Sequence, residues 1–277
     1  MTIDSELPLL LPELSGMVEN PDVEVRRATI KPSDSAPGLP VDLKGIEARI
    51  PDDSTLVVDP KRQAAPIVSR VVLKLCLPAL LFHRGATILH AGAVDIGGRG
   101  VAFAGQQDAG KSSLVTAMCQ RGHRFLTDDV LAVVEADGAR RAVPSFPRTS
   151  LAPETRDALG FDGQRVATMD DRPEDWFDIE DQFGTEPTQI DVLYMLKERG
   201  VVDSPKIRTL DGQTAMERLT EHVIQFPGPE TSDPLARLFH ECTDLCQSVP
   251  VKLLERPDGF EAMPDVIDHI EEDVEAL

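Results

Sequence analysis

One stretch decides the fold of this 277-residue chain: Val101-Ala102-Phe103-Ala104-Gly105-Gln106-Gln107-Asp108-Ala109-Gly110-Lys111-Ser112-Ser113-Leu114-Val115-Thr116-Ala117-Met118-Cys119. Residues 105–113 match the phosphate-binding loop pattern G-x-x-x-x-G-K-[ST]. The apolar residues 101–104 predict a strand that enters the loop, and residues 113–119 predict a helix that leaves it. This context favours a phosphate loop over a glycine turn that carries Lys-Ser by coincidence.

The pattern assigns a chemical role to each part of the loop. Successive backbone N–H groups at a helix N-terminus form a concave anion site. Lys111 can reach the terminal phosphates of a nucleotide, and the Ser112 hydroxyl is placed to bind Mg²⁺. The predicted nucleotide-binding residues are Gly105, Gln106, Gln107, Asp108, Ala109, Gly110, Lys111, Ser112 and Ser113. The sequence therefore predicts a site for ATP or another nucleoside triphosphate.

The charge of the chain is strongly negative, with 48 acidic and 28 basic residues and a formal net charge of −20. Only 8 of the basic residues are lysines. This balance is typical of cytoplasmic proteins from salt-loving organisms, although an ordinary acidic protein is the alternative. Self-repulsion of such a surface is screened at molar salt, where the Debye length is about 3 Å.

Charge and hydropathy exclude several partners. No basic patch is present to bind nucleic acid, and the negative charge disfavours anionic membranes. The longest apolar run, 71–82, is too short for a membrane span, and Asp4 and Glu6 replace the basic start of a secretory signal. We therefore expect a cytoplasmic protein. Cys242 and Cys246 lie near His240, but they share a helical apolar stripe with Leu235, Leu238, Phe239 and Leu245, which favours core packing over a metal site.

The organisation predicted along the chain is an N-terminal β-containing appendage, 1–62, followed by one α/β domain, 63–277. The elements expected are β-like stretches at 23–30 and 45–58, a helix over 66–82 that Pro78 kinks or divides, and strands at 88–96 and 100–104 joined by a Gly97-Gly98 turn. Further on we expect a strand at 124–126, a hairpin of 130–135 and 140–143 around Asp137-Gly138, a helix over 153–159, and a strand at 190–196. A helix from Asp211 to about 225, another after Asp233, a strand at 249–254 and a helix from Pro264 complete the chain. Residues 161–188 are polar and are expected to form a mobile loop.

Two adjacent carboxylates follow the phosphate loop and are candidates for the second acidic site that a P-loop NTPase needs. Asp128 and Asp129 come 17 and 18 residues after Lys111, which leaves room for one helix and one short strand. That strand is expected to lie beside the strand before the loop. Because successive strand side chains point to opposite faces, only one aspartate can face the phosphates directly. One of the pair is a candidate to hold Mg²⁺ or to accept a proton, whereas two solvated turn acids are the alternative. His90 lies in the strand that precedes the loop strand, where a packed core histidine is the alternative to a catalytic one.

At this point the residues show a resemblance. Leu89-His90-Ala91, the phosphate loop, and Arg121-Gly122-His123-Arg124-Phe125-Leu126-Thr127-Asp128-Asp129 resemble the catalytic domain of bacterial HPr kinase/phosphorylase and its smaller relatives. In that family a histidine precedes the loop lysine by 21 residues and an aspartate follows it by 18. His90 and Asp129 have these spacings from Lys111. The match covers roughly residues 88–130.

The resemblance implies a fold and a set of roles. The fold would be a P-loop kinase domain with a mixed central sheet and flanking helices. Asp129 would be the general base toward an acceptor hydroxyl, Lys111 would stabilise the transferring phosphoryl group, and His90 would lie beside the phosphates. Ser112 and Asp128 would hold Mg²⁺. The chain departs from the family at the fourth loop position, which is Asp108 where glycine is frequent, and the downstream Arg-Gly-Leu-Gly segment is not recognisable.

Two functions follow from these residues. The first is an ATP-dependent kinase that passes the γ-phosphoryl group to a serine-like hydroxyl of an unidentified protein, peptide or small molecule. The second is a nucleotide-binding regulatory switch or weak NTPase, which Asp108 and the absent downstream segment favour. A carboxykinase-type enzyme would need further metal and oxaloacetate ligands, which the sequence does not locate. A homo-oligomer is compatible with the sequence.

Overall fold

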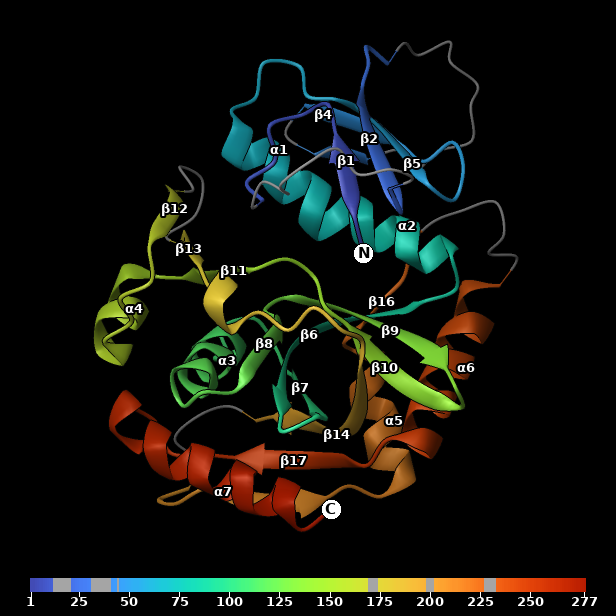
Figure 1. Cartoon of the computed structure of the whole chain (residues 1–277). Coiled ribbons are helices and arrows are strands. Elements are labelled where there is room, and N and C mark those ends of the chain that lie inside the picture. Colours follow the sequence, from blue (N-terminus) through green and yellow to red (C-terminus); the bar gives the residue numbers. More distant parts are fainter. Residues whose placement is uncertain (12–20, 31–40, 44, 169–173, 198–201, 227–232) are drawn as a thin grey trace. The chain divides into compact units, whose positions relative to one another are not determined.

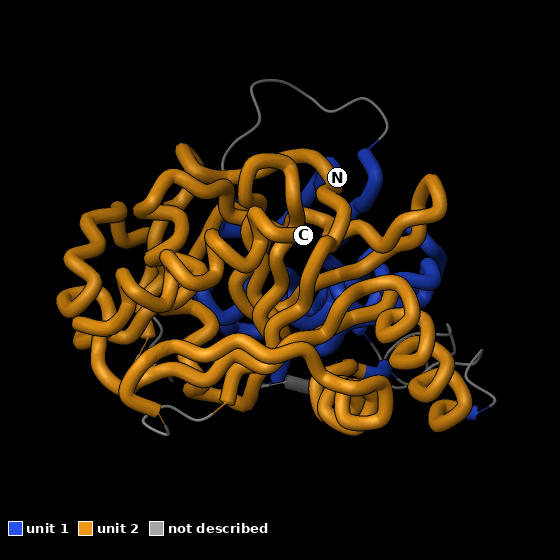
Figure 2. The backbone as a smooth tube through the Cα atoms, turned by 90° about the horizontal axis from the view of Figure 1, so that it is seen from below, with its two compact units in different colours: residues 1–86, 225–233 blue, residues 87–224, 234–277 orange. Residues whose placement is uncertain are grey.

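The computed structural model of the chain describes residues 1–11, 21–30, 41–43, 45–168, 174–197, 202–226 and 233–277. Its contacts divide the chain into two units (Figure 2). Unit 1 comprises Met1–Ala86 and Gln225–Asp233, and unit 2 comprises Thr87–Ile224 and Pro234–Leu277. The domain boundary predicted after residue 62 therefore falls inside unit 1, because the helix that follows it packs on the N-terminal strands.

Unit 1 combines a five-stranded mixed sheet with one helical rod. The strands are β1 (Ile3–Ser5), β2 (Val23–Arg27), β3 (Val41–Leu43), β4 (Ile46–Arg49) and β5 (Thr55–Asp59), in the order β1-β2-β5-β4-β3. The rod consists of α1 (Ala65–Val71), a π-helical turn η1 (Val72–Cys76) and α2 (Leu77–His83). Buried valines, leucines and isoleucines of the strands and the rod form one core cluster.

The rod is longer than the apolar run read from the sequence. Pro78 lacks an N–H and crowds the carbonyl four residues earlier, and the wider π-helical turn η1 lies directly before it. The proline thus divides the rod into two α-helical segments without ending it, as predicted. From the sequence, the apolar run 71–82 is expected to be too short for a membrane span. The helical rod Ala65–His83 has 19 residues and is long and apolar enough to cross a membrane, so that expectation of length is corrected. Of its most apolar window 67% is buried within the structure, as expected of a core helix.

Unit 2 is built on a nine-stranded mixed sheet with helices on both faces (Figure 1). The strands of this sheet are β6 (Thr87–Ile96), β7 (Arg99–Ala104), β8 (Arg124–Thr127), β9 (Val130–Ala136), β10 (Ala139–Val143), β14 (Thr188–Leu196), β15 (Lys206–Thr209), β16 (Val223–Ile224) and β17 (Val251–Glu255). The helices are α3 (Lys111–Gln120), α4 (Pro153–Leu159), α5 (Gly212–Thr220), α6 (Pro234–Ser248) and α7 (Met263–Glu275), with short turns η2 (Glu180–Gln182) and η3 (Phe260–Ala262). The mixed α/β class with flanking helices predicted from the sequence is confirmed.

Alternation along the central strands separates two cores. In β7, Ala102 and Ala104 face one core, while Val101 and Phe103 face the other. The first core takes buried residues of α5 and α6, and the second takes those of α3 and α7. This layering places the phosphate loop at one end of a sheet that is buried on both faces.

The pairing of the central strands differs from the sequence prediction. The sheet order is β10-β9-β6-β7-β14-β17-β15, and β8 pairs with β6 rather than with β7. The edge of β7 away from β6 is taken by β14, which pairs with it in parallel. The long strand β6 instead offers one edge to β9 along Thr87–His90 and to β8 along Ala93–Asp95. Because β10 also pairs with β14, the strands β10, β9, β6, β7 and β14 form a closed ring.

The expected mobile loop over 161–188 is wrong for the residues that the structure describes. Strands β11 (Arg148–Leu151), β12 (Arg165–Thr168) and β13 (Asp175–Asp178) form a three-stranded antiparallel sheet. Trp176 and Phe177 of β13 are 1% exposed and anchor this sheet. Their burial outweighs the polar composition of the segment, which is why composition alone misled. Residues 169–173 lie outside the described part of the chain.

Three further details correct or extend the prediction. The helix begun at Asp211, whose side chain accepts the N–H of Thr214, ends at Thr220 rather than near 225, because Val223–Ile224 pair with β6.

On α6, Cys242 is buried as predicted, but Leu235 and Phe239 are 77% and 65% exposed. The apolar stripe is therefore wider than the face that packs on the sheet.

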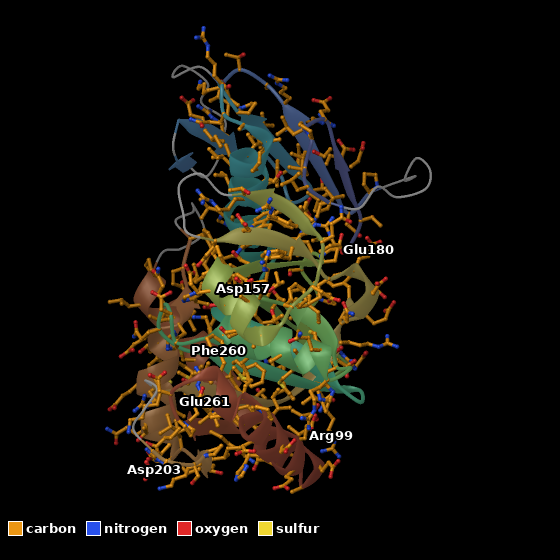
Figure 3. All side chains as sticks on the ribbon, turned by 90° about the vertical axis from the view of Figure 1, so that its left-hand side faces the viewer. Arg99, Asp157, Glu180, Asp203, Phe260 and Glu261 are labelled. Carbon is orange, nitrogen blue, oxygen red and sulfur yellow. The ribbon has the colours of Figure 1, made fainter. Side chains whose placement is uncertain are left out.

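The C-terminal helix α7 is tied to the sheet by polar contacts as well as by packing. Its Asp273 accepts hydrogen bonds from Tyr194 Oη (2.5 Å) and from Lys252 Nζ (2.7 Å). Arg99, labelled in Figure 3, donates to the carbonyl of Val274 at 2.7 Å. The strands β14, β17 and β7 each supply one of these donors. The helix is thus held against three neighbouring strands.

Candidate phosphate-loop site

The loop between β7 and α3 has the backbone of an anion cradle. Asp108 and Gly110 adopt left-handed conformations, with φ of +61° and +85°, and the Ala109 N–H donates to the Gln106 carbonyl at 3.1 Å. A Cβ on Gly105 would lie 3.0 Å from Leu196 Cβ, so only glycine fits there without a shift. Aspartate is among the few side chains that tolerate the left-handed region, which explains how Asp108 occupies its position.

Lys111 lies inside this loop. The side chain is buried, and its Nζ donates to the carbonyls of Gly105 (2.8 Å) and Gln106 (3.0 Å). Burial lowers the pKa of Lys111, and the carboxylates of Asp129, Asp128 and Asp108 act in the opposite direction. The Lys111 ammonium therefore interacts electrostatically with three carboxylates.

His90 and Asp129 are brought together by the sheet. His90 Nε2 lies 3.2 Å from Asp129 Oδ1, and both side chains are about a third exposed, at 33% and 37%. Their backbones are held in place, since the N–H of Ala91 donates to the Asp129 carbonyl at 3.1 Å. The alternation of β6 puts His90 on the same face as Gly92, whose missing Cβ would lie 2.7 Å from Val115 of α3. The pair therefore lies on the side of the sheet that carries the loop helix.

Asp128 turns away from its neighbour into the protein. It is 5% exposed, and its Oδ2 accepts hydrogen bonds from Thr149 Oγ1 (3.0 Å) and from the backbone N–H of Ser150 (2.7 Å). Asp129, in contrast, faces His90 and solvent. The two carboxylates thus have different surroundings, which matches the expectation that they cannot both point the same way.

Three residues near the loop carry no signal in the sequence. His222 lies between α5 and β16 and is buried, and its backbone carbonyl accepts a hydrogen bond from the backbone N–H of His90 at 2.8 Å. The His222 side chain also interacts electrostatically with His90 and Lys111. Glu221 accepts a hydrogen bond from the Gln106 side chain at 3.0 Å. Arg256 is buried just after β17, and its charge acts on Lys111. They come from more than 100 residues further along the chain, so only the fold places them here.

The residues present fit a nucleotide with Mg²⁺. Gly105 is buried, where a Cβ would press on Leu196 and Ala109, and Ser112, half-buried in the first turn of α3, follows Lys111 directly. Gln106 and Gln107 are exposed, while Ser113 is buried. A hydroxyl and a carboxylate are hard oxygen ligands of the type Mg²⁺ prefers, and Mg²⁺ is usually held by one or two carboxylates plus phosphate oxygens. Ser112 and Asp128 are the residues that would hold it.

Comparison with curated proteins identifies relatives of one kind. Over 65 residues the chain is 40% identical to an HPr kinase/phosphorylase of Clostridium botulinum (strain Eklund 17B / Type B). This alignment covers 24% of this chain and 21% of that protein. In this segment the chain is similar to HPr kinase/phosphorylases. An HPr kinase/phosphorylase of Clostridium beijerinckii is 38% identical over 52 residues, or 19% of this chain and 17% of the relative. The chain therefore matches about a fifth of the length of these curated relatives.

No family model matches the chain. Among solved structures, an Hpr(Ser) kinase/phosphatase from Coxiella burnetii aligns over 68% of this chain and 97% of its own, with a TM-score of 0.37 and 15% sequence identity.

Proposed function

We propose that this chain is a P-loop kinase that transfers the γ-phosphoryl group of ATP to a serine-like hydroxyl of a protein, peptide or small molecule. The observation that carries the proposal is the His90–Asp129 pair, 3.2 Å apart, on the face of the sheet that holds the Lys111 loop. A buried lysine in a glycine-rich loop is a phosphate-binding feature, and an acidic side chain beside it supplies the proton acceptor that phosphoryl transfer uses. The curated relatives carry the name HPr kinase/phosphorylase, which supports the same reaction class.

Binding of the nucleotide uses the loop backbone and Lys111. The N–H groups at the start of α3 surround the phosphates, where the helix dipole also favours negative charge. Lys111 now donates to two loop carbonyls, so nucleotide binding exchanges these bonds for bonds to phosphate oxygens. Ser112 and Asp128 would hold Mg²⁺, which would neutralise charge on the phosphate oxygens.

The transfer step needs one proton acceptor. Asp129 accepts the proton of the acceptor hydroxyl as its oxygen bonds to the γ-phosphorus, and the bond from the γ-phosphorus to the β,γ-bridging oxygen breaks to release ADP. His90 holds Asp129 Oδ1 within hydrogen-bonding distance and orients that carboxylate. Lys111 stabilises the negative charge on the transferring group. The proposed catalysis thus depends on the positioning of the reacting groups and on stabilisation of their charge. We place this activity in the cytoplasm.

A second function has one observation in its favour. Asp108 is an exposed carboxylate inside the phosphate loop, where its charge opposes nucleotide phosphates. A chain that binds nucleotide weakly and does not transfer the phosphoryl group would act as a regulatory switch or slow NTPase.

Labelled ATP distinguishes these functions. The protein is incubated at high salt with γ-labelled ATP and an extract of its own organism, with purified HPr as a separate candidate acceptor. The kinase proposal expects label in an acceptor, its loss in Lys111→Ala, and its loss with retained nucleotide affinity in Asp129→Asn. Asp137→Asn, at the 89% exposed tip of the β9–β10 turn, is the matched control and should transfer normally. Nucleotide binding without transfer or turnover would establish the switch instead, and transfer that survives Lys111→Ala would refute the mechanism.

A further inference from the structure

Asp128 is held by a buried strand that the sequence did not connect with it. The two groups that donate to its Oδ2, the Thr149 hydroxyl at 3.0 Å and the Ser150 N–H at 2.7 Å, both belong to β11. Thr149 has no exposed surface, and Asp128 has 5%. The orientation of this carboxylate is therefore set from inside the protein, by β11, and not by solvent.

The same hydroxyl continues to the phosphate-loop helix. Thr149 Oγ1 lies 3.0 Å from Thr116 Oγ1, and Thr116 is also fully buried. A hydroxyl has one proton to donate, and a carboxylate only accepts, so the Thr149 proton goes to Asp128. Thr116 must then be the donor to Thr149. The result is a directed chain of hydrogen bonds from Thr116 through Thr149 to Asp128.

Thr116 connects this chain to the predicted metal ligand on the helix. It follows Ser112 by four residues in α3, and residues four apart lie on one helix face, about 5–6 Å between their Cβ atoms. The hydrogen-bond chain therefore fixes Asp128 relative to the helix face that carries Ser112. These are the two side chains that the proposed function assigns to Mg²⁺.

We propose that Thr149 is a positioning residue, which orients the Asp128 carboxylate toward the metal of the nucleotide complex through the Thr116–Thr149–Asp128 chain. The proposal rests on the proposed function, because it needs Mg²⁺ and a nucleotide at this loop. Two buried hydroxyls cost desolvation energy that apolar side chains of the same shape avoid, so their presence beside Asp128 is explained by a requirement for hydrogen bonding there. Partners that orient metal ligands change metal affinity by 10–100-fold when they are removed.

The test measures nucleotide affinity with and without the metal. The dissociation constant of a fluorescent ATP analogue is determined in Mg²⁺ and in EDTA for the wild type, Thr149→Val and Thr149→Ser. We expect Thr149→Val to reduce the Mg²⁺-dependent gain in affinity about 10–100-fold. The affinity in EDTA should stay within about 2-fold, and Thr149→Ser, which keeps the hydroxyl, should keep most of the gain. Thr188→Val in β14 removes another buried hydroxyl, one that donates to the Glu186 carbonyl, and serves as the control.

Each outcome has a distinct meaning. An unchanged Mg²⁺-dependent gain in Thr149→Val would overturn the positioning role, even if wild-type phosphoryl transfer confirms the proposed function. A wild type without Mg²⁺-dependent nucleotide binding would overturn both. If Thr149→Val does not fold, Thr116→Val removes the donor to Thr149 and leaves the bond to Asp128; a smaller loss of the same gain supports the chain, and no loss refutes it. Equal losses in Thr149→Val and Thr188→Val would show a general effect on stability and would also refute it.

Discussion

Stability should depend on pH through His222. This side chain is buried between α5 and β16, and its burial lowers its pKa to about 4. The positive charges of His90 on β6 and Lys111 on α3 act in the same direction, as does Arg218 of α5, while Glu221 opposes them. The folded chain therefore keeps His222 neutral at neutral pH.

The sign of the pH effect follows from proton binding. In the unfolded chain His222 has an ordinary pKa of 6.5, so between about pH 6.5 and about pH 4 the unfolded state binds more protons than the folded state. Stability is then lost as the pH falls through this window. The cost is about 2 kcal/mol at pH 5 and approaches about 3 kcal/mol below pH 4.

Urea unfolding at constant high salt measures this cost. The free energy of unfolding is compared at pH 8, 7, 6 and 5 for the wild type and for His222→Gln, which has no titrating group at this position. Carboxylates contribute equally to both proteins, so the difference between them isolates His222. We expect the wild type to lose about 2 kcal/mol relative to His222→Gln between pH 8 and pH 5.

An exposed histidine provides the control. His240 on α6 is 79% exposed, and His240→Gln should follow the wild type across the whole pH range. A difference between wild type and His222→Gln that stays constant from pH 8 to pH 5 would show that His222 is not kept neutral by burial. The same difference in His240→Gln would assign the effect to histidine content rather than to the buried position.

Three other changes have defined outcomes. Gly105→Ala places a Cβ 3.0 Å from Leu196 Cβ and should cost about 1–3 kcal/mol in urea unfolding and weaken nucleotide binding, whereas Gly212→Ala, with no atom within 4 Å of its Cβ, should do neither. Asp108→Gly removes a charge and a left-handed non-glycine residue from the loop and should tighten ATP binding several-fold; weaker binding would mean that Asp108 contacts the ligand productively. Lowering KCl from molar to about 0.1 M should reduce the melting temperature of this chain of net charge −20, and an equal melting temperature in both salts would exclude the halophile interpretation.

The elements whose signals are local could be predicted from the sequence. The turn at Gly97-Gly98 joins β6 to β7, and Asp137 and Gly138 have φ of +53° and +72° in the β9–β10 turn. The phosphate loop, Gly160 after α4 and Pro264 in the first turn of α7 are of the same kind. Each of these features depends on the backbone preference of one or two residues, so a short stretch of sequence is enough to predict it.

What the sequence could not show depends on contacts between distant segments. The pairing of β8 with β6 follows from β14 taking the edge of β7, and β14 lies more than 80 residues after β7. The sheet in 148–178 depends on the burial of Trp176, which composition does not reveal. His222 and Arg256 reach the phosphate loop by the same long-range folding. The family resemblance predicts roles for His90 and Asp129 from their spacing to Lys111, whereas the partners of Asp128 lie in β11, which only the fold brings beside it.

The closed ring of β10, β9, β6, β7 and β14 has a consequence for how the molecule assembles. The ring is closed by the pairing of β10 with β14, where Arg141 lies opposite Gln189 and Ala142 opposite Thr188, almost 50 residues apart in the chain. Bringing these segments together costs chain entropy before the contacts between them stabilise the ring. Because each strand of the ring pairs with two neighbours, a one-residue slip of any strand would disturb both of its pairings. The end of β7 that carries the phosphate loop thus acquires its final position only when the whole ring has formed. Nucleotide affinity during refolding should therefore appear in one step, together with the last strand pairing.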